Sequence, residues 1–196
     1  MHRSRATILT ICLLAAAALA AAALTGCGPD KRAQIALTKG NAALAAYATS
    51  EDAIAGKLAQ AAAVPPTPDG VKPGLTLLAE VDKAMPARRA AAATAKAQFT
   101  AFKEAATDAK QRGYADRAIA LADGLIRLDA GTVSLTKNMT ELYQAVAKNS
   151  SNTDRVVALA DAVSKGQPTY DKLRAEVKTL SDAADAYYQA NLAVKK

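Results

Sequence analysis

The chain has 196 residues and a formal net charge of +7; 51% of its residues are hydrophobic, only 4% are aromatic, and tryptophan is absent. Its single histidine is His2, and its two cysteines are Cys12 and Cys27. The ten glycines are scattered and do not form a phosphate-binding loop. This composition leaves little material for nucleophilic, metal-dependent or nucleotide-dependent catalysis.

The first 26 residues are predicted to be a secretory signal peptide. Arg3 and Arg5 form a basic start, and no charged residue follows from Ala6 to Pro29. About 20 apolar residues would also suffice to span a membrane. The run is mostly alanine after Leu14 and therefore only weakly apolar. We expect a cleaved signal, with an uncleaved anchor or an ordinary signal carrying a chance cysteine as the alternative.

The end of this run, Leu24-Thr25-Gly26-Cys27, resembles the lipobox of bacterial lipoproteins. The resemblance implies that a dedicated peptidase recognises Leu24, Thr25 and Gly26, that it cuts before Cys27, and that the Cys27 thiol carries a diacylglycerol with palmitate-type chains. Cleavage would discard His2 and Cys12. The mature chain would then lack histidine, which predicts that it is not an enzyme and holds no cofactor or metal.

The resemblance also implies a location in the bacterial cell envelope. The lipid would hold the protein on the outer side of the cytoplasmic membrane, or in the outer membrane if the organism has one. Residues 28–30, Gly-Pro-Asp, form a short stem after the anchor. We expect residues 31–196 to be a single helical domain.

The mature composition favours helix throughout. Of the 170 residues from Cys27 onward, 42 are alanine, the residue with the highest helix propensity. The 23 basic residues exceed the 18 acidic ones by 5, and the two signs are interspersed. Such a surface is typical of solvated helices, with attraction to anionic lipid or a cell-wall polymer as the alternative. No nucleic-acid partner is expected.

The first helix is predicted over residues 31–64. Leu37, Leu44 and Leu58 recur at heptad spacing, and Glu51 occupies the place of a fourth core residue. Either the row of core residues drifts locally and Glu51 lies at its edge, or Glu51 makes a polar or ligand contact.

A connection of ten residues, 65–74, is predicted next, and it contains Pro65, Pro66, Pro68 and Pro73. Such a segment favours polyproline geometry, which docks into aromatic grooves. The four prolines are therefore a candidate partner-binding loop. The alternative is a stiff connector across the end of the bundle.

The second helix is predicted over residues 75–112, with a kink at Pro86 and an interruption of its core row at Arg88. A turn at residues 111–113 leads to a third helix, 114–148. Its core rows are complete over four heptads, with one row formed by Leu121, Leu128, Leu135 and Leu142.

After a turn at residues 149–152, a helix is predicted to reach Lys165 and to continue beyond Gly166-Gln167-Pro168 to the C-terminus. Proline lacks the amide donor and clashes with the preceding turn, so a kink or a break is expected near Pro168. The last part of this element repeats the heptad pattern, with one row formed by Leu173, Leu180, Tyr187 and Val194.

Four helices of similar length predict an all-α, elongated, up-and-down antiparallel bundle with coiled-coil-like heptad packing. If the first helix rises from the membrane, this topology collects six basic residues at the membrane end. These possible membrane-surface contacts are Lys31, Arg32, Lys110, Arg112, Lys195 and Lys196.

The expected function is that of a non-catalytic scaffold, adaptor or spacer anchored to the membrane. Its partner would be an unidentified envelope protein or a cell-wall polymer, and self-assembly through a spare heptad face stays open. The alternative is a carrier that holds a small apolar ligand or lipid between alanine-lined helices. A core without voids favours the scaffold, whereas an apolar cavity favours the carrier.

Overall fold

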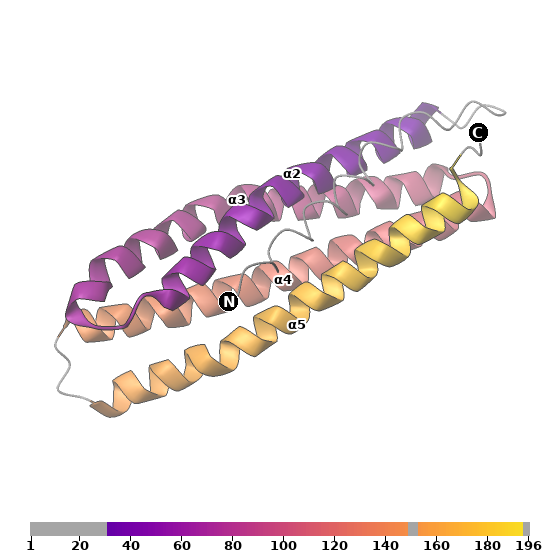
Figure 1. Cartoon of the computed structure of the whole chain (residues 1–196). Helices are drawn as coiled ribbons and strands as arrows, with labels where there is room; N and C mark the ends of the chain where they lie inside the picture. Colours follow the sequence, from indigo (N-terminus) through magenta and orange to yellow (C-terminus); the bar gives the residue numbers. More distant parts are fainter. Residues whose placement is uncertain (1–30, 149–152, 194–196) are drawn as a thin grey trace.

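The protein is an up-and-down antiparallel four-helix bundle, seen in a computed structural model that describes residues 31–148 and 153–193. The helices are α2 (Lys31–Ala63), α3 (Pro68–Ala105), α4 (Ala109–Ala147) and α5 (Thr153–Asn191). Figure 1 shows them running side by side along one axis. A helix of 38 residues such as α3 is about 57 Å long at 1.5 Å per residue, so the bundle is a rod.

The helices pack in chain order, α2 on α3, α3 on α4 and α4 on α5. Along one diagonal, α2 and α4 also approach each other. Among the described residues, no Cα atom of α2 lies within 8 Å of one in α5, so long side chains span this edge of the bundle.

The predicted heptad rows form the core. All four leucines of the α4 row are buried, as are Leu37, Leu44 and Leu58 of α2. Near the end where α2 begins, Tyr114 packs edge-on against three rings, with centroid distances of 6.2 Å to Phe99, 6.4 Å to Phe102 and 5.6 Å to Tyr188. The expected fold class is therefore confirmed.

The ten-residue connection predicted at 65–74 was wrong, because α3 already begins at Pro68 and the connection is limited to residues 64–67. Pro68 stands in the first turn, where a missing amide donor costs nothing. The amides of Gly70 and Val71 donate to the Thr67 carbonyl at 2.9 and 3.1 Å and begin the helix. Pro73 is also helical, so only Pro65 and Pro66 lie in the connection.

The turn predicted at residues 111–113 was also misplaced, since α3 ends at Ala105 and α4 begins at Ala109. The Asp108 side chain caps α4 by accepting from the Gln111 amide at 2.8 Å. In return, Gln111 Oε1 accepts from the Thr107 amide at 3.3 Å. These two hydrogen bonds fix the helix start, and an Asp followed three residues later by Gln was a weak signal for it.

Prolines inside the helices do not divide them. Pro86 lies within α3 and Pro168 within α5, and both helices are continuous. Of the two outcomes left open at Pro168, the break is excluded, and residues on both sides belong to one helix. The turn at 149–152 lies outside the described residues.

Glycines set the close approaches between neighbouring helices. A Cβ atom at Gly74 of α3 would lie 2.5 Å from Cζ of Tyr143 in α4, and one at Gly124 of α4 would lie 2.7 Å from Cδ1 of Leu180 in α5. The Tyr143 hydroxyl lies 2.8 Å from the carbonyl oxygens of Ala61 and Val64, where α2 ends. The Tyr143 ring thus packs on Gly74 of α3, and its hydroxyl contacts the backbone where α2 ends.

Gly74→Ala is expected to lower the free energy of unfolding by about 1–3 kcal/mol, because the added methyl group must displace a ring held by two carbonyl oxygens. Urea unfolding followed by circular dichroism measures this change. The matched control is Gly56→Ala in α2, which adds a Cβ where nothing lies within 4 Å. It is expected to gain about 0.4–1 kcal/mol through lower chain entropy. Equal stability of the two variants would contradict the packing at Gly74.

Candidate functional site

Three fully buried charged residues meet at the middle of the bundle. Glu51 of α2, Arg88 of α3 and Asp129 of α4 expose 2%, 1% and 2% of their surface. Arg88 Nη2 lies 2.7 Å from Glu51 Oε2, and Arg88 Nε lies 2.8 Å from Asp129 Oδ1. One guanidinium therefore joins carboxylates from the helices on both sides of it.

Tyr47 adds a hydroxyl to this cluster. Arg88 Nη2 donates to the Tyr47 oxygen at 2.5 Å, and the Tyr47 hydroxyl donates to Asp129 Oδ1 at 2.9 Å. The guanidinium carbon also lies 4.6 Å from the centroid of the Tyr47 ring, which places the cation over the electron-rich face. The ring is completely buried, so these interactions act without competition from solvent.

The fourth helix joins the cluster through Arg174. Its Nε donates to Glu51 Oε1 at 3.2 Å, and its side chain is 27% exposed. This contact spans the α2–α5 edge, where the two backbones stay apart. The five residues Tyr47, Glu51, Arg88, Asp129 and Arg174 are called the central cluster below, and they come from all four helices.

The central cluster is electrically balanced, with two arginines and two carboxylates. Burial opposes the charge on Arg88, but Glu51, Tyr47 and Asp129 outweigh that cost and raise its pKa, so it stays protonated. Burial also raises the pKa of Glu51 and of Asp129, and the nearby Arg88 only partly offsets this. Burial raises the pKa of Tyr47 as well, which keeps its hydroxyl a neutral donor.

This arrangement links three helices through one buried guanidinium. Arg88 holds both carboxylates as counter-ions, and each carboxylate comes from a different helix. A charged group removed from water is costly without a counter-ion, and here Arg88 Nη1 and Asp129 Oδ2 also lack a hydrogen-bond partner. The cluster therefore favours the one register of the four helices in which all its members meet.

The antiparallel register agrees with this requirement over a long stretch. The pair Gly74 and Tyr143 and the pair Arg88 and Asp129 both join α3 to α4. Arg88 lies 14 residues after Gly74, and Asp129 lies 14 residues before Tyr143. The two contacts thus belong to one register, which is held over four helical turns.

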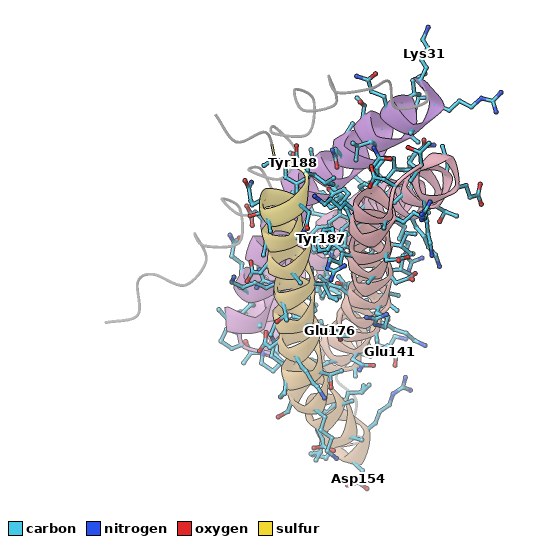
Figure 2. The ribbon with its side chains drawn as sticks, turned by 90° about the vertical axis from the view of Figure 1, so that its right-hand side faces the viewer. Lys31, Glu141, Asp154, Glu176, Tyr187 and Tyr188 are labelled. Atoms are coloured by element: carbon cyan, nitrogen blue, oxygen red, sulfur yellow. The ribbon has the colours of Figure 1, made fainter. Side chains whose placement is uncertain are left out.

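The predicted membrane end is partly within the described residues. Lys31, Arg32, Lys110 and Arg112 lie at the starts of α2 and α4, which are at the same end of the rod as the end of α5. Figure 2 shows Lys31 at the end opposite Asp154, the second residue of α5. Arg112 Nη1 donates to the Ala106 carbonyl at 3.0 Å and so supports the turn. Lys195 and Lys196 lie outside the described residues.

The other predicted sites have mixed outcomes. Pro65, Pro66, Pro68 and Pro73 are all exposed near the opposite end of the rod, but only the first two form a loop. Their role in binding a partner stays a prediction. The lipobox, residues 24–27, lies outside the described residues, and so does the stem.

Two members of the central cluster were visible in the sequence as charged residues within apolar heptad rows, whereas the role of the others was not visible. Glu51 and Arg88 each stand at a heptad position that should be apolar, and their opposite charges on adjacent helices were the signal for a pair. Asp129 and Arg174 lie beside the heptad rows, where charged residues are ordinary. Only the register of α4 and α5 brings these two residues to the cluster.

Comparison with protein families, with characterised proteins and with solved structures found no match to this chain. Among the described residues, no helix is long and apolar enough to cross a membrane. The same part of the chain has no group of three or more histidine, cysteine, aspartate or glutamate side chains arranged to hold a metal ion. Functional inference therefore rests on the geometry of the bundle.

Arg88→Met is expected to lower the free energy of unfolding by about 3–5 kcal/mol, because it leaves Glu51 and Asp129 buried without their counter-ion. The matched control is Lys83→Met on the exposed face of α3, with an expected change within about 0.5 kcal/mol. The triple variant Arg88→Met, Glu51→Leu, Asp129→Leu is expected to regain most of the loss. A small effect of Arg88→Met alone would contradict the conclusion that Arg88 is the counter-ion of both buried carboxylates.

The pH dependence of stability provides a separate check on the central cluster. Because burial raises the Glu51 pKa, the folded state binds more protons than the unfolded state between its ordinary value near 4.5 and its raised value. This contribution to stability is present at low pH and is lost as pH rises through the raised pKa. Urea unfolding from pH 4.5 to 7.5 should show wild type losing stability relative to Glu51→Gln. The opposite slope would mean that Arg88 lowers the Glu51 pKa.

Proposed function

We propose that this chain is a lipid-anchored envelope protein whose bundle acts as a rigid, non-catalytic scaffold or spacer. The observation that supports this function best is the close packing where neighbouring helices meet at glycines. The gaps at glycines are filled by large side chains from the next helix, such as Tyr143 at Gly74, Leu180 at Gly124 and Leu173 at Gly131. A close-packed interior has low compressibility, which suits a rigid rod.

The same observation disfavours the alternative function. A carrier of an apolar ligand needs open apolar volume between its helices. The glycines do not provide it here, because aromatic and leucine side chains occupy the spaces that several of them leave. No observation on the described helices therefore supports the alternative function of a ligand carrier.

The orientation on the membrane follows from the length of the stem. Three residues separate Cys27 from Lys31, the first residue of α2. At about 3.6 Å per extended residue, that stem reaches at most about 14 Å. An acylated Cys27 would keep the start of α2 at the membrane surface and hold the 64–67 connection at the far end of the rod. Basic residues near the start of α2 and α4 would then lie close to the lipid headgroups.

A photo-crosslinking amino acid placed in living cells tests this function. Position 67 is exposed at the far end, and the Thr67 side chain makes no capping bond, so its replacement costs no known contact. Position 107 is the matched control, an exposed threonine in the connection at the other end. We expect a defined envelope protein to be captured from position 67 and not from position 107.

The same experiment in a Cys27→Ala background separates anchoring from binding. Loss of the lipid is expected to move the protein out of the membrane fraction and to reduce capture from position 67. Retention in the membrane fraction would contradict the lipid anchor. Capture of cell-wall polymer only, or of nothing, from position 67 in the acylated protein would contradict the scaffold for a protein partner.

A further inference from the structure

The outer face of α2 carries an exposed isoleucine at the end of the rod where the stem joins. Three large hydrophobic side chains of the described residues are exposed, and Ile35, at 46%, is the one at this end. Ile126 lies near the middle of α4, and Val157 lies in α5 near the far end. A single exposed apolar side chain needs no explanation, so the residues around it decide what it can contact.

Two lysines flank Ile35 on the outer face of α2. Lys31 and Lys39 stand four residues before and four residues after it, which places them about 40° to either side around the helix axis. Both lysines are exposed, and Figure 2 shows Lys31 pointing away from the neighbouring helices. The exposed Thr38 beside them donates its hydroxyl hydrogen to the Gln34 carbonyl at 2.9 Å, within the helix. Lys31, Ile35 and Lys39 are called the α2 face below.

The start of α2 also differs in charge from the other helices at this end of the rod. Residues 31–50 include three basic residues and no acidic one. Over the 20 residues nearest to the same end, each of the other helices carries acidic side chains, such as Glu104 in α3, Asp116 in α4 and Asp182 in α5. The side of the rod formed by α2 is therefore the side that best complements an anionic surface.

We propose that the α2 face lies on anionic phospholipid headgroups, with Ile35 inserted among them, so that the rod tilts toward its α2 side. This inference rests on the proposed lipid anchor, because only three residues separate Cys27 from α2. An upright α2 would hold Ile35 about 6 Å farther from the membrane than Lys31, four residues earlier. A tilted α2 brings all three residues of the α2 face to the surface together.

The side chains of the α2 face act in different ways on such a surface. The lysine ammonium groups attract anionic headgroups, while their methylene stems cover apolar surface and leave the charge in water. The isoleucine between them adds burial of apolar area, as amphipathic helices do at a membrane interface. The stem reaches at most about 14 Å, so the anchor keeps the α2 face within reach of the headgroups.

Spin labels on the acylated mature protein, in vesicles of equal parts phosphatidylglycerol and phosphatidylcholine, test this contact. The chain after residue 26 has no cysteine other than Cys27, so Ile35→Cys introduces a single labelling site. Ile126→Cys is the matched control, because Ile126 is 40% exposed near the middle of α4. We expect position 35 to lose most of its collisions with a water-soluble nickel complex and position 126 to keep them. Equal access of the nickel complex to both positions would overturn the proposal.

The tilt and the anchor fail in different ways. Mass spectrometry of the same sample shows whether Cys27 carries acyl chains, and absence of these chains would contradict the proposed function itself. An acylated protein whose position 35 stays open to the nickel complex would overturn the contact of the α2 face and leave the anchor intact.

Removal of the two lysines from the labelled protein tests the charge contribution. Lys31→Gln together with Lys39→Gln is expected to shift the equilibrium toward the exposed form about fivefold for each lysine. The matched control is Lys83→Gln together with Lys137→Gln, which lowers the net charge equally at exposed positions of α3 and α4. This control should leave position 35 shielded. The same shift in both double variants, or equal shielding of position 35 in pure phosphatidylcholine vesicles, would overturn the recognition of anionic headgroups by the α2 face.

Discussion

The geometry of this bundle depends on one buried guanidinium. Arg88 lies at the middle of α3 and reaches a carboxylate on α2 and another on α4, while Arg174 extends the network to α5. An apolar row such as Leu121, Leu128, Leu135 and Leu142 of α4 would tolerate a slip of one heptad, because one leucine would take the place of the next. Charges that are buried in water-free surroundings do not tolerate it, since a slip leaves each of them without a partner.

Stability is distributed unevenly around this point. Aromatic rings strengthen the end where α2 begins, and the central cluster ties the four helices in the middle. At the other end, Tyr143 fastens α2 to α4, but the first half of α5 buries no side chain. Burial is therefore less extensive in the first half of α5 than in the other three helices.

The sequence predicted the fold because helix-forming composition and heptad spacing are local signals. Four amphipathic segments of similar length have few ways to bury their apolar rows other than an antiparallel bundle. The helix limits were less predictable. Four prolines suggested a long loop, yet Pro68 fits the first turn of a helix, where the missing donor has no effect. Asp108 caps α4 and Gln111 accepts from the preceding Thr107 amide, but this was a weak signal in the sequence beside Gly113.

For the central cluster, the sequence by itself determined that Glu51 and Arg88 stand at core positions, because heptad spacing is visible along one helix. It also determined a signal-like N-terminus and the absence of histidine after it. Only the tertiary structure decided that these two residues meet and that Asp129 and Arg174 complete the network. It also decided that the buried side chains of α5 lie in its second half. These contacts depend on the register of the helices and on the distances between them. Side chains from several helices determine both together, so no single segment encodes them.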